Sequence, residues 1–381
     1  MQRQGIYLLL LSVVGLVTLG VVMLFSTSAF AQDSHGDIYY FVKRQVFWLV
    51  IGSGACVAGA LVDYHRWRDW WPWWFGVSAF LLVLCFVPHV GMRINGASRW
   101  INLHVATFQP SELAKLGALF FLCWWFSREE TESRRVLQGL VIPMAVVSCL
   151  LALIAVEVDL GTTALIGAMA VGICFVAGAN KWLIGGLGTA GVAGILMIAS
   201  FIPERYARLT SFLHPENEKL GKGLQQWNAM IAFGSGGFEG LGLGNGRQKL
   251  LYLPEAHTDF IFPMIGEELG LPFTWMVVLG FILIILAGGL IAANGKDRFG
   301  KLLALGILLL ISLQAAVNIG MTTSLLPNKG MPLPFISYGG SNLAVSLFMV
   351  GILINIHRTG APIPVAARRQ VALASRPVPR I

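Results

Sequence analysis

The sequence predicts an all-α membrane protein that crosses the bilayer several times. Of its 381 residues, 56% are hydrophobic and only 12% are charged, whereas charged residues make up about 25% of an ordinary soluble domain. The mean hydropathy is +0.72, and several apolar stretches are long enough for a helix to span a bilayer. We therefore expect the formal charge of +8 to lie in loops that orient the helices, and not on a nucleic-acid-binding surface.

Ten apolar runs are expected to form the spanning helices. They cover residues 6–26, 45–63, 71–88, 112–127, 137–156, 161–179, 182–202, 260–293, 301–324 and 341–357. Alternate loops hold most of the basic residues, among them Arg66, Arg128 and Lys181. Because basic loops stay on the cytoplasmic side, both termini are predicted to be cytoplasmic. Residues 203–259 then form a large extracytoplasmic loop between the seventh and eighth helices.

The segments outside this pattern have separate interpretations. Residues 29–31 (AFA) resemble a signal-peptidase site, but the preceding apolar run exceeds the usual length of about 7–15 residues, so we interpret it as the first spanning helix. Residues 1–358 are predicted to form one transmembrane domain, and residues 359–381 a basic, proline-containing cytoplasmic tail without stable structure. The glycine-rich residues 233–246 suit either close backbone packing, which we favour, or a cradle of backbone N–H groups for phosphate.

Ionisable residues interrupt the apolar pattern at several predicted helix ends. Glu112 and Lys115 are spaced i,i+3 and are expected to pair on one helix face, as a neutralised structural pair or as part of a cavity wall. Asp159, just after Glu157, is predicted to cap the next helix, which does not exclude a cavity role. Asp259 stands at the start of the eighth helix.

These interruptions all open on the external side, which indicates one shared site there. Residues 326–342 hold three prolines and three glycines, and such backbone is tolerated at membrane depth only inside protein or beside a water-filled cavity. Ser341 or Asn342 is predicted to cap the last helix. Four basic residues lie near the interruptions: Arg44, Arg99, Lys115 and Lys329. Since basic side chains bind phosphate and a carboxylate can act as a general base, the residues alone predict an outward-facing site for a lipid-linked anion.

Several short motifs resemble those of a known family. They are NGASRWI at 95–101, QPSE at 109–112, DLGT at 159–162, HTDFIF at 257–262, GEE at 266–268 and PLPFISYGGS at 332–341. In this order they resemble the SEDS family (shape, elongation, division and sporulation), over about residues 6–358. The resemblance implies ten transmembrane helices with a large loop between helices 7 and 8. It also implies a peptidoglycan glycosyltransferase, which polymerises lipid II at the outer face of the cytoplasmic membrane and releases undecaprenyl pyrophosphate.

The resemblance also implies roles for individual residues. Asp259 matches the family's essential aspartate, which is proposed to deprotonate the acceptor sugar's 4-hydroxyl or to help hold a divalent cation such as Mg²⁺ or Mn²⁺. No other cofactor is expected. The residues predicted to bind substrate or line the cavity are Arg44, Arg99, Trp100, Glu112, Lys115, Asp159, Lys329 and Ser341.

Within the family, the chain is more similar to the division branch, FtsW, than to the elongation branch, RodA. Residues 327–334 (PNKGMPLP) contain a lysine that the elongation branch generally lacks, and residues 255–259 and 265–268 favour the same branch. The implied partners are a class B penicillin-binding protein, which is a transpeptidase, and other divisome membrane proteins. The implied location is the inner membrane at the division septum.

Four positions depart from the family's usual pattern. Val158 stands where proline is common, Pro263 where alanine is common, Asn328 in place of threonine and Asn342 in place of serine. They leave Asp259 unchanged but weaken the assignment to a branch. Three alternatives stay open: a flippase or transporter of the same precursor, a non-catalytic divisome scaffold, and an elongation-type polymerase.

Overall fold

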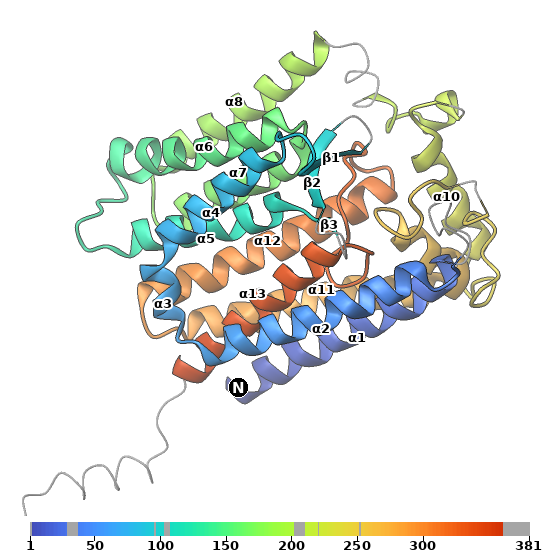
Figure 1. Cartoon of the computed structure of the whole chain (residues 1–381), viewed down its shortest axis with the longest axis horizontal. Helices are drawn as coiled ribbons and strands as arrows, with labels where there is room; N and C mark the ends of the chain where they lie inside the picture. Colours follow the sequence, from blue (N-terminus) through green and yellow to red (C-terminus); the bar gives the residue numbers. More distant parts are fainter. Residues whose placement is uncertain are drawn as a thin grey trace, which may run out of the picture.

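A computed structural model describes residues 2–28, 37–94, 97–102, 107–201, 210–219, 221–250 and 253–360. Its long helices lie side by side in one bundle (Figure 1). They are α1 (Gln2–Ser28), α2 (Tyr40–Leu61), α4 (Trp71–Leu84), α5 (Pro110–Ser127), α6 (Ile142–Val156), α7 (Leu160–Val176), α8 (Lys181–Ser200), α11 (Ile261–Ala293), α12 (Arg298–Thr322) and α13 (Gly340–Gly360). A short α3 (Tyr64–Asp69) follows α2, and the π-helical turn η1 (Leu137–Val141) precedes α6. Each predicted apolar run falls on one of the long helices.

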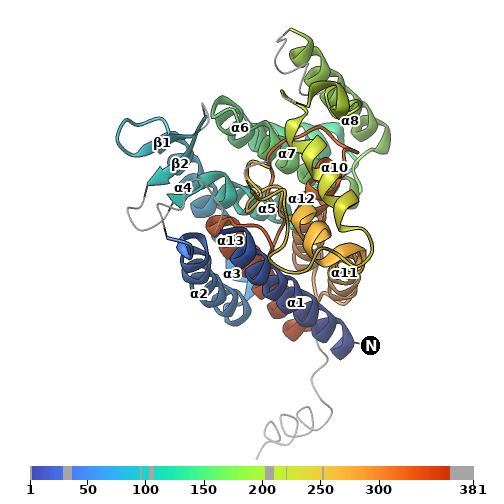
Figure 2. The same cartoon turned by 90° about the vertical axis from the view of Figure 1, so that its right-hand side faces the viewer.

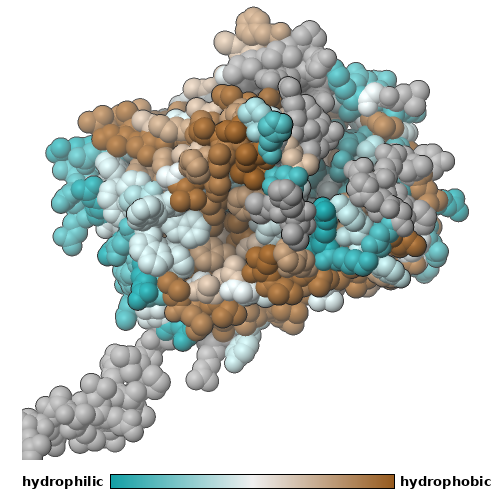
Figure 3. All heavy atoms as spheres, viewed as in Figure 1, coloured by the Kyte–Doolittle hydropathy of each residue, from teal (hydrophilic) through white to brown (hydrophobic). Residues whose placement is uncertain are grey.

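The helices have the length and composition of membrane-spanning segments. Within the described ranges, six are long and apolar enough to cross a bilayer: α1, α2, η1 with α6, α11, α12 and α13. Two shorter apolar helices are α4 and α7. The visible face is largely apolar between two hydrophilic ends (Figure 3). The prediction of a helical, multi-pass membrane protein is therefore confirmed.

Glycines allow the closest helix contacts in the bundle. A Cβ on Gly351 of α13 would lie 2.1 Å from the carbonyl oxygen of Cys56 in α2, and one on Gly59 of α2 would lie 2.9 Å from the carbonyl oxygen of Phe348. Small residues at such contacts let helix backbones approach closely inside membranes. Figure 2, a view turned toward the end of the bundle, shows α13 beside α2.

The longest helix, α11, consists of two segments. Its 33 residues would extend about 50 Å at about 1.5 Å per residue, more than the hydrocarbon thickness of about 30 Å. Gly270 has φ 78° and ψ −172° inside this helix, and Pro272 follows. The chain therefore turns at Gly270, and the first segment, which begins directly after Asp259, has a direction of its own.

The prediction of an all-α fold is wrong in one detail. Three short antiparallel strands precede α5: β1 (Gly91–Ile94), β2 (Ala97–Asn102) and β3 (Thr107–Phe108), in the order β1-β2-β3. Met92 pairs with Trp100 and Arg93 with Ser98, so Arg99 is the extra residue of a bulge in β2. Because a bulge turns its side chain out of the regular alternation, it gives Arg99 a direction that strand alternation would not.

The segment between α8 and α11 is partly helical. It contains the 3₁₀ turn η2 (Pro215–Glu218) and α10 (Leu224–Gly236), which lie at the end of the bundle opposite α3 (Figure 1). The glycine-rich residues that follow α10 contact α11. The predicted tail beyond residue 360 lies outside the described residues.

Candidate functional site

Asp259 occupies a partly buried position where two loops meet. It precedes α11, and its backbone carbonyl accepts a hydrogen bond from Asn318 Nδ2 of α12 at 2.8 Å. Gly330, in the loop between α12 and α13, has φ 58°. A Cβ at Gly330 would lie 3.1 Å from Asp259 Oδ2, so glycine permits both this backbone conformation and the close approach to the carboxylate.

Arg99 and Asp159 complete what we call the aspartate cluster (Arg99, Asp159 and Asp259). Arg99 Nη1 lies 3.8 Å from Asp159 Oδ1, and the buried Nε of Arg99 has no hydrogen-bond partner among the described residues. Asp159 accepts from the backbone N–H of Thr162 at 3.1 Å, which confirms the predicted cap of α7. Its other oxygen accepts from Gln109 Nε2 at 3.1 Å. The carboxylate therefore both caps a helix and faces the arginine.

Burial and nearby charges make Asp259 a weaker acid than an ordinary aspartate. Burial, followed by the nearby carboxylate of Glu255, raises the pKa of Asp259 to about 7, while Arg99 acts in the opposite direction and Asp159 raises it further. The carboxyl group therefore holds its proton to a much higher pH than an ordinary aspartate does. A group with a pKa near the operating pH is best suited to accept a proton from a substrate.

The predicted ion pair between Glu112 and Lys115 is confirmed and lies beside this cluster. Lys115 Nζ lies 2.8 Å from Glu112 Oε1, and both side chains are only 3% exposed. The second carboxylate oxygen of Glu112 accepts from Asn342 Nδ2 at 3.1 Å, and Lys115 also donates to Gln314 Oε1 at 2.9 Å. Both charges are thus paired and hydrogen-bonded, as burial requires.

The prediction that Ser341 or Asn342 caps the last helix is wrong, because α13 already begins at Gly340. Ser341 Oγ instead accepts a hydrogen bond from the backbone N–H of Gln109 at 3.0 Å. Since Gln109 also contacts Asp159, these bonds connect the starts of α5, α7 and α13.

A group of aromatic rings from α2 borders Asp259 on the side of His257. The Phe41 ring lies 4.2 Å from the His257 ring and 4.9 Å from the Tyr338 ring. The Arg44 guanidinium lies 4.4 Å over the Tyr40 ring. Burial raises the pKa of the Tyr338 phenol, and the nearby Arg44 opposes that shift. Arg44 therefore lies beside the rings of Tyr40 and Tyr338.

Two further predicted residues are neighbours of the cluster. The backbone of Lys329 approaches α7, because a Cβ on Gly161 would lie 3.2 Å from the Lys329 carbonyl oxygen. Trp100 follows Arg99 in β2 and pairs with Met92 of β1. The described residues include no group of three or more His, Cys, Asp or Glu side chains that could hold a metal ion.

A second set of buried charges serves structure, and its contacts join segments far apart in the sequence. This glutamate cluster comprises Ser26, Lys249, Glu267 and Glu268. Lys249 Nζ lies 2.6 Å from Glu268 Oε1 and also donates to Ser26 Oγ at 2.8 Å. The Glu267 carboxylate accepts the backbone N–H groups of Arg247 and Gln248 at 2.9 and 3.2 Å. The glycine-rich segment is thereby fixed to α11.

Glycines again make this contact close. A Cβ on Gly240 would lie 2.4 Å from the Glu268 carbonyl oxygen, and one on Gly246 would lie 2.8 Å from Glu268 Oε1. The geometry agrees with the favoured interpretation of residues 233–246, close backbone packing. The nearby backbone N–H groups of Gly244, Arg247 and Gln248 donate to glutamate oxygens, so those groups are not available to a phosphate.

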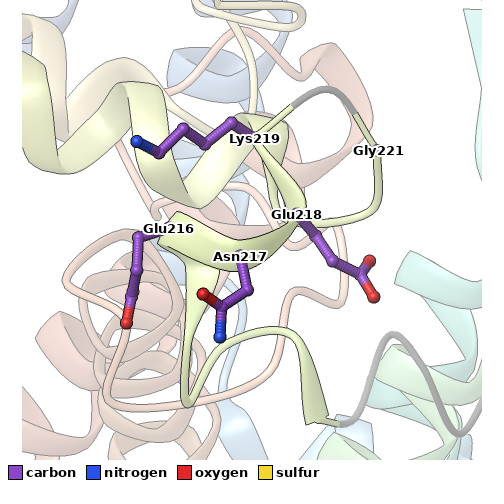
Figure 4. A pocket seen from close by; sticks show the side chains of 5 residues that line it. All are labelled: Glu216, Asn217, Glu218, Lys219 and Gly221. Atoms are coloured by element: carbon purple, nitrogen blue, oxygen red, sulfur yellow. The ribbon is translucent and has the colours of Figure 1, made fainter.

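The hollow shown in Figure 4 is a separate surface feature of the loop. Its volume is about 500 Å³, and it is lined by Glu216, Asn217, Glu218, Lys219 and Gly221. Glu216 and Glu218 are exposed, and the hollow holds none of the motif residues. Two carboxylates and one amine give it a net negative character, which does not suit an anionic substrate.

The fold and these polar groups define a multi-pass helical membrane protein with a polar cluster where several helices begin. The family model described as "Cell cycle protein", for FtsW, RodA and SpoVE, matches residues 7–361. The chain belongs to this family, the SEDS family. Similar relatives include the "Probable peptidoglycan glycosyltransferase FtsW" of Trichlorobacter lovleyi, 39% identical, with 91% of this chain and 92% of the relative covered. The "Stage V sporulation protein E" of Bacillus subtilis is 38% identical over 90% of this chain and 94% of the relative.

Solved structures share the fold. A chain from a structure described as "Structural coordination of polymerization and crosslinking by a peptidoglycan synthase complex" superposes with a TM-score of 0.74 at 25% identity, covering 91% of this chain and 97% of that one. The rod shape determining protein RodA of Thermus thermophilus gives a TM-score of 0.68 at 24% identity, covering 93% and 97%.

Proposed function

We propose that this chain is a peptidoglycan glycosyltransferase that polymerises lipid II at the outer face of the cytoplasmic membrane. The observation that carries the proposal is the position of Asp259, a partly buried carboxylate that lies against Gly330 and whose backbone is held by Asn318. The names of relatives similar over nine-tenths of the chain support the same activity. The ten long helices, with the basic loops inside, would then all cross the membrane and leave residues 203–259 outside.

The proposed reaction is a displacement at the donor's anomeric carbon. The Asp259 carboxylate accepts the proton from the acceptor sugar's 4-hydroxyl, and the resulting oxygen forms the new glycosidic bond. The bond from the anomeric carbon to the pyrophosphate breaks, and undecaprenyl pyrophosphate leaves with the electron pair. Positive groups stabilise the charge that develops on the leaving group. Arg99 and Lys329 are the candidates: Arg99 of β2 is among the charges that act on Asp259, and Lys329 adjoins Gly330, which lies against the Asp259 carboxylate.

A divalent cation, where the reaction uses one, would be held in part by Asp259. The described residues include no group of three or more His, Cys, Asp or Glu side chains that could hold a metal ion, and Asp259 with Asp159 would contribute two carboxylates. Mg²⁺ commonly binds through one or two carboxylates and substrate phosphates. A requirement for such an ion would therefore be a property of the substrate complex.

The division branch is the proposed cellular role. Several similar relatives carry the name FtsW, which favours septal peptidoglycan synthesis over elongation. The fold shared with a chain of a peptidoglycan synthase complex supports a class B penicillin-binding protein as partner. Other divisome membrane proteins are further proposed partners.

Purified protein with its transpeptidase partner and labelled lipid II tests the proposal directly. Wild type should form glycan chains, and Asp259→Asn should lower the rate by at least about 100-fold, because a general base contributes about 10²–10⁴-fold. Glu216→Gln is the matched control, since it removes an exposed carboxylate of the loop. A wild-type rate in Asp259→Asn would exclude Asp259 as the base.

The alternative function, a flippase, is tested with the same purified protein and labelled lipid II. Reconstituted vesicles that carry labelled lipid II on one leaflet should show polymer in the presence of the partner. Movement of the label across the bilayer without polymer would favour the transporter. The absence of both activities, with an intact complex, would favour the scaffold.

A further inference from the structure

Two buried amide side chains on α12 hold the backbone of the loops that form the site. Gln314 is 4% exposed and Asn318 is fully buried. Their i,i+4 spacing places them one above the other on the same helix face. Neither belongs to the motifs that carry the family resemblance, and neither has a role in the mechanism above.

Asn318 connects the loop of Asp259 to the loop of Gly330. Its Nδ2 donates to the carbonyl oxygen of Asp259 at 2.8 Å and to the carbonyl oxygen of Met331 at 2.6 Å. A primary amide has two N–H donors, and Asn318 uses both to connect the backbones of these two loops. The bridge sets the separation at which Gly330 meets the Asp259 carboxylate.

Gln314 extends this connection to the buried ion pair. Its Oε1 accepts from Lys115 Nζ at 2.9 Å, and its Nε2 donates to the carbonyl oxygen of Pro332 at 2.9 Å. Because Met331 and Pro332 are adjacent, the two amides hold consecutive residues of one loop. Hydrogen bonds therefore link Glu112 through Lys115 and Gln314 to Pro332. The peptide bond between Pro332 and Met331 joins this set to the Asn318 bridge and the Asp259 backbone.

The position of Asn318 is costly for stability alone. Its Oδ1 is buried without a hydrogen-bond partner, and an unsatisfied buried acceptor costs about 1–3 kcal/mol. Polar side chains inside membrane helices carry such costs mainly where they serve a site. An amide that bridges two loops of the site, at the expense of one unpaired oxygen, fits that rule.

We propose that Asn318 is a positioning residue that fixes the Asp259 carboxylate against Gly330, and that Gln314 ties this geometry to the Glu112–Lys115 pair. The inference rests on the proposed function, in which Asp259 is the base. Neither amide touches the reacting atoms. Both act through the backbone that carries Asp259.

The charges around Asp259 make the inference measurable by pH. They come from Glu255 on the same loop, Asp159 before α7 and Arg99 in β2, with Lys329 next to Gly330 in the facing loop. Burial is the largest of the causes that raise the pKa of Asp259. If the Asn318 bridge is lost, the loops separate and water reaches the carboxylate. Its pKa then falls toward the ordinary aspartate value, and the acid limb of the rate profile moves to lower pH.

The experiment measures the pH dependence of polymerisation by the complex with its transpeptidase, for wild type, Asn318→Ala and Asn318→Ser. We expect kcat to fall on the order of tenfold, because small misplacements of a catalytic group are costly, with KM changed by less than about twofold. We expect the acid midpoint to fall by about one pH unit. Asn318→Ser leaves a smaller cavity than alanine would and keeps one donor, so it serves if Asn318→Ala does not fold.

Asn355→Ala is the matched control. Asn355 of α13 is another buried amide that bridges two segments, through Tyr64 N at 3.0 Å and Ala60 O at 2.8 Å. It should lower stability and leave the acid midpoint unchanged. An unchanged midpoint in both Asn318 variants, with no greater loss of kcat than in Asn355→Ala, would overturn the inference.

Asp259→Asn in the same assay separates this inference from the proposed function. If Asp259→Asn is inactive while the Asn318 variants keep the wild-type profile, only the positioning role of Asn318 fails. If Asp259→Asn keeps the wild-type rate, the assignment of the base fails, and the positioning role fails with it.

Discussion

The aspartate cluster and the glutamate cluster differ in how completely their polar atoms are paired. In the glutamate cluster, Glu268 accepts hydrogen bonds from Ser26, Lys249 and the backbone of Gly244. In the aspartate cluster, the contact between Arg99 and Asp159 is long, at 3.8 Å, and Arg99 Nε is unpaired. The polar atoms of the glutamate cluster are bonded within the protein. The aspartate cluster retains an Arg99 N–H that is not bonded to any described residue.

This difference separates structure from function among buried charges. A fully paired cluster can hold a loop against a helix, but it has little left to offer a ligand. The aspartate cluster has a guanidinium nitrogen without a described partner, which can bind an anion. It also has a carboxyl group of raised pKa, which can accept a proton. Substitutions in the two clusters should therefore have opposite effects on stability and activity.

The largest effect is expected from removing the positive charge of the glutamate cluster. Lys249→Met leaves Glu268 buried without its cation, and breaking such a pair costs about 3–5 kcal/mol of unfolding free energy. Thermal unfolding of the purified protein in detergent measures this loss. Asp259→Asn should leave the unfolding temperature close to that of wild type.

The double variant Lys249→Met with Glu268→Gln controls for the lost contacts. Neutralising both partners should recover part of the stability, because the penalty comes mainly from the unpaired charge. If Lys249→Met unfolds at the wild-type temperature yet loses polymerisation, the two clusters do not differ in role as proposed.

Sequence patterns predicted the local part of this architecture. Apolar runs located the long helices, and the i,i+3 spacing of Glu112 and Lys115 predicted their pairing, because both features depend on neighbours in the chain. Asp159 was likewise predicted as a cap from the residue type that precedes an apolar run. The placement of the polar interruptions on the external side predicted one shared site, whereas the choice of Asp259 as its base came only from the family resemblance.

Contacts between distant segments could not be predicted in the same way. Ser26 and Glu268 are 242 residues apart, and the bulge at Arg99 depends on how β1 pairs with β2. The capping prediction for Ser341 and Asn342 failed because both side chains bind α5 instead. One signal was available and missed: Gln314 and Asn318 lie four residues apart on an otherwise apolar helix, which indicates a polar face directed inward.

A smaller effect is expected at the buried pair beside the aspartate cluster. Lys115→Gln alone should cost about 3 kcal/mol of unfolding free energy, the low end of the range for a broken buried pair, because the glutamine amide can still donate a hydrogen bond to Glu112 although the cation is lost. The double variant Glu112→Gln with Lys115→Gln should cost less than the single one. Thermal unfolding and polymerisation rate are measured for both variants, and equal loss of activity in the two would indicate direct chemistry by one member of the pair.

The smallest expected effect is a shift of the pH profile in Arg99→Gln, which is measured separately from any loss of rate at the leaving group. Arg99 lowers the pKa of Asp259, so Arg99→Gln should raise that pKa above its value of about 7. Since the base must be deprotonated to act, the acid limb of kcat/KM should move to higher pH by about one unit, equivalent to about 1.4 kcal/mol. This direction is opposite to that expected for the Asn318 variants, because one change removes a positive charge and the other admits water.

Arg44→Gln is the control, since its guanidinium lies over Tyr40 and is not among the groups that shift the pKa of Asp259. A midpoint that stays fixed in Arg99→Gln would mean that Asp259 does not titrate in the reaction, and the contrast between the two clusters would then rest on geometry alone.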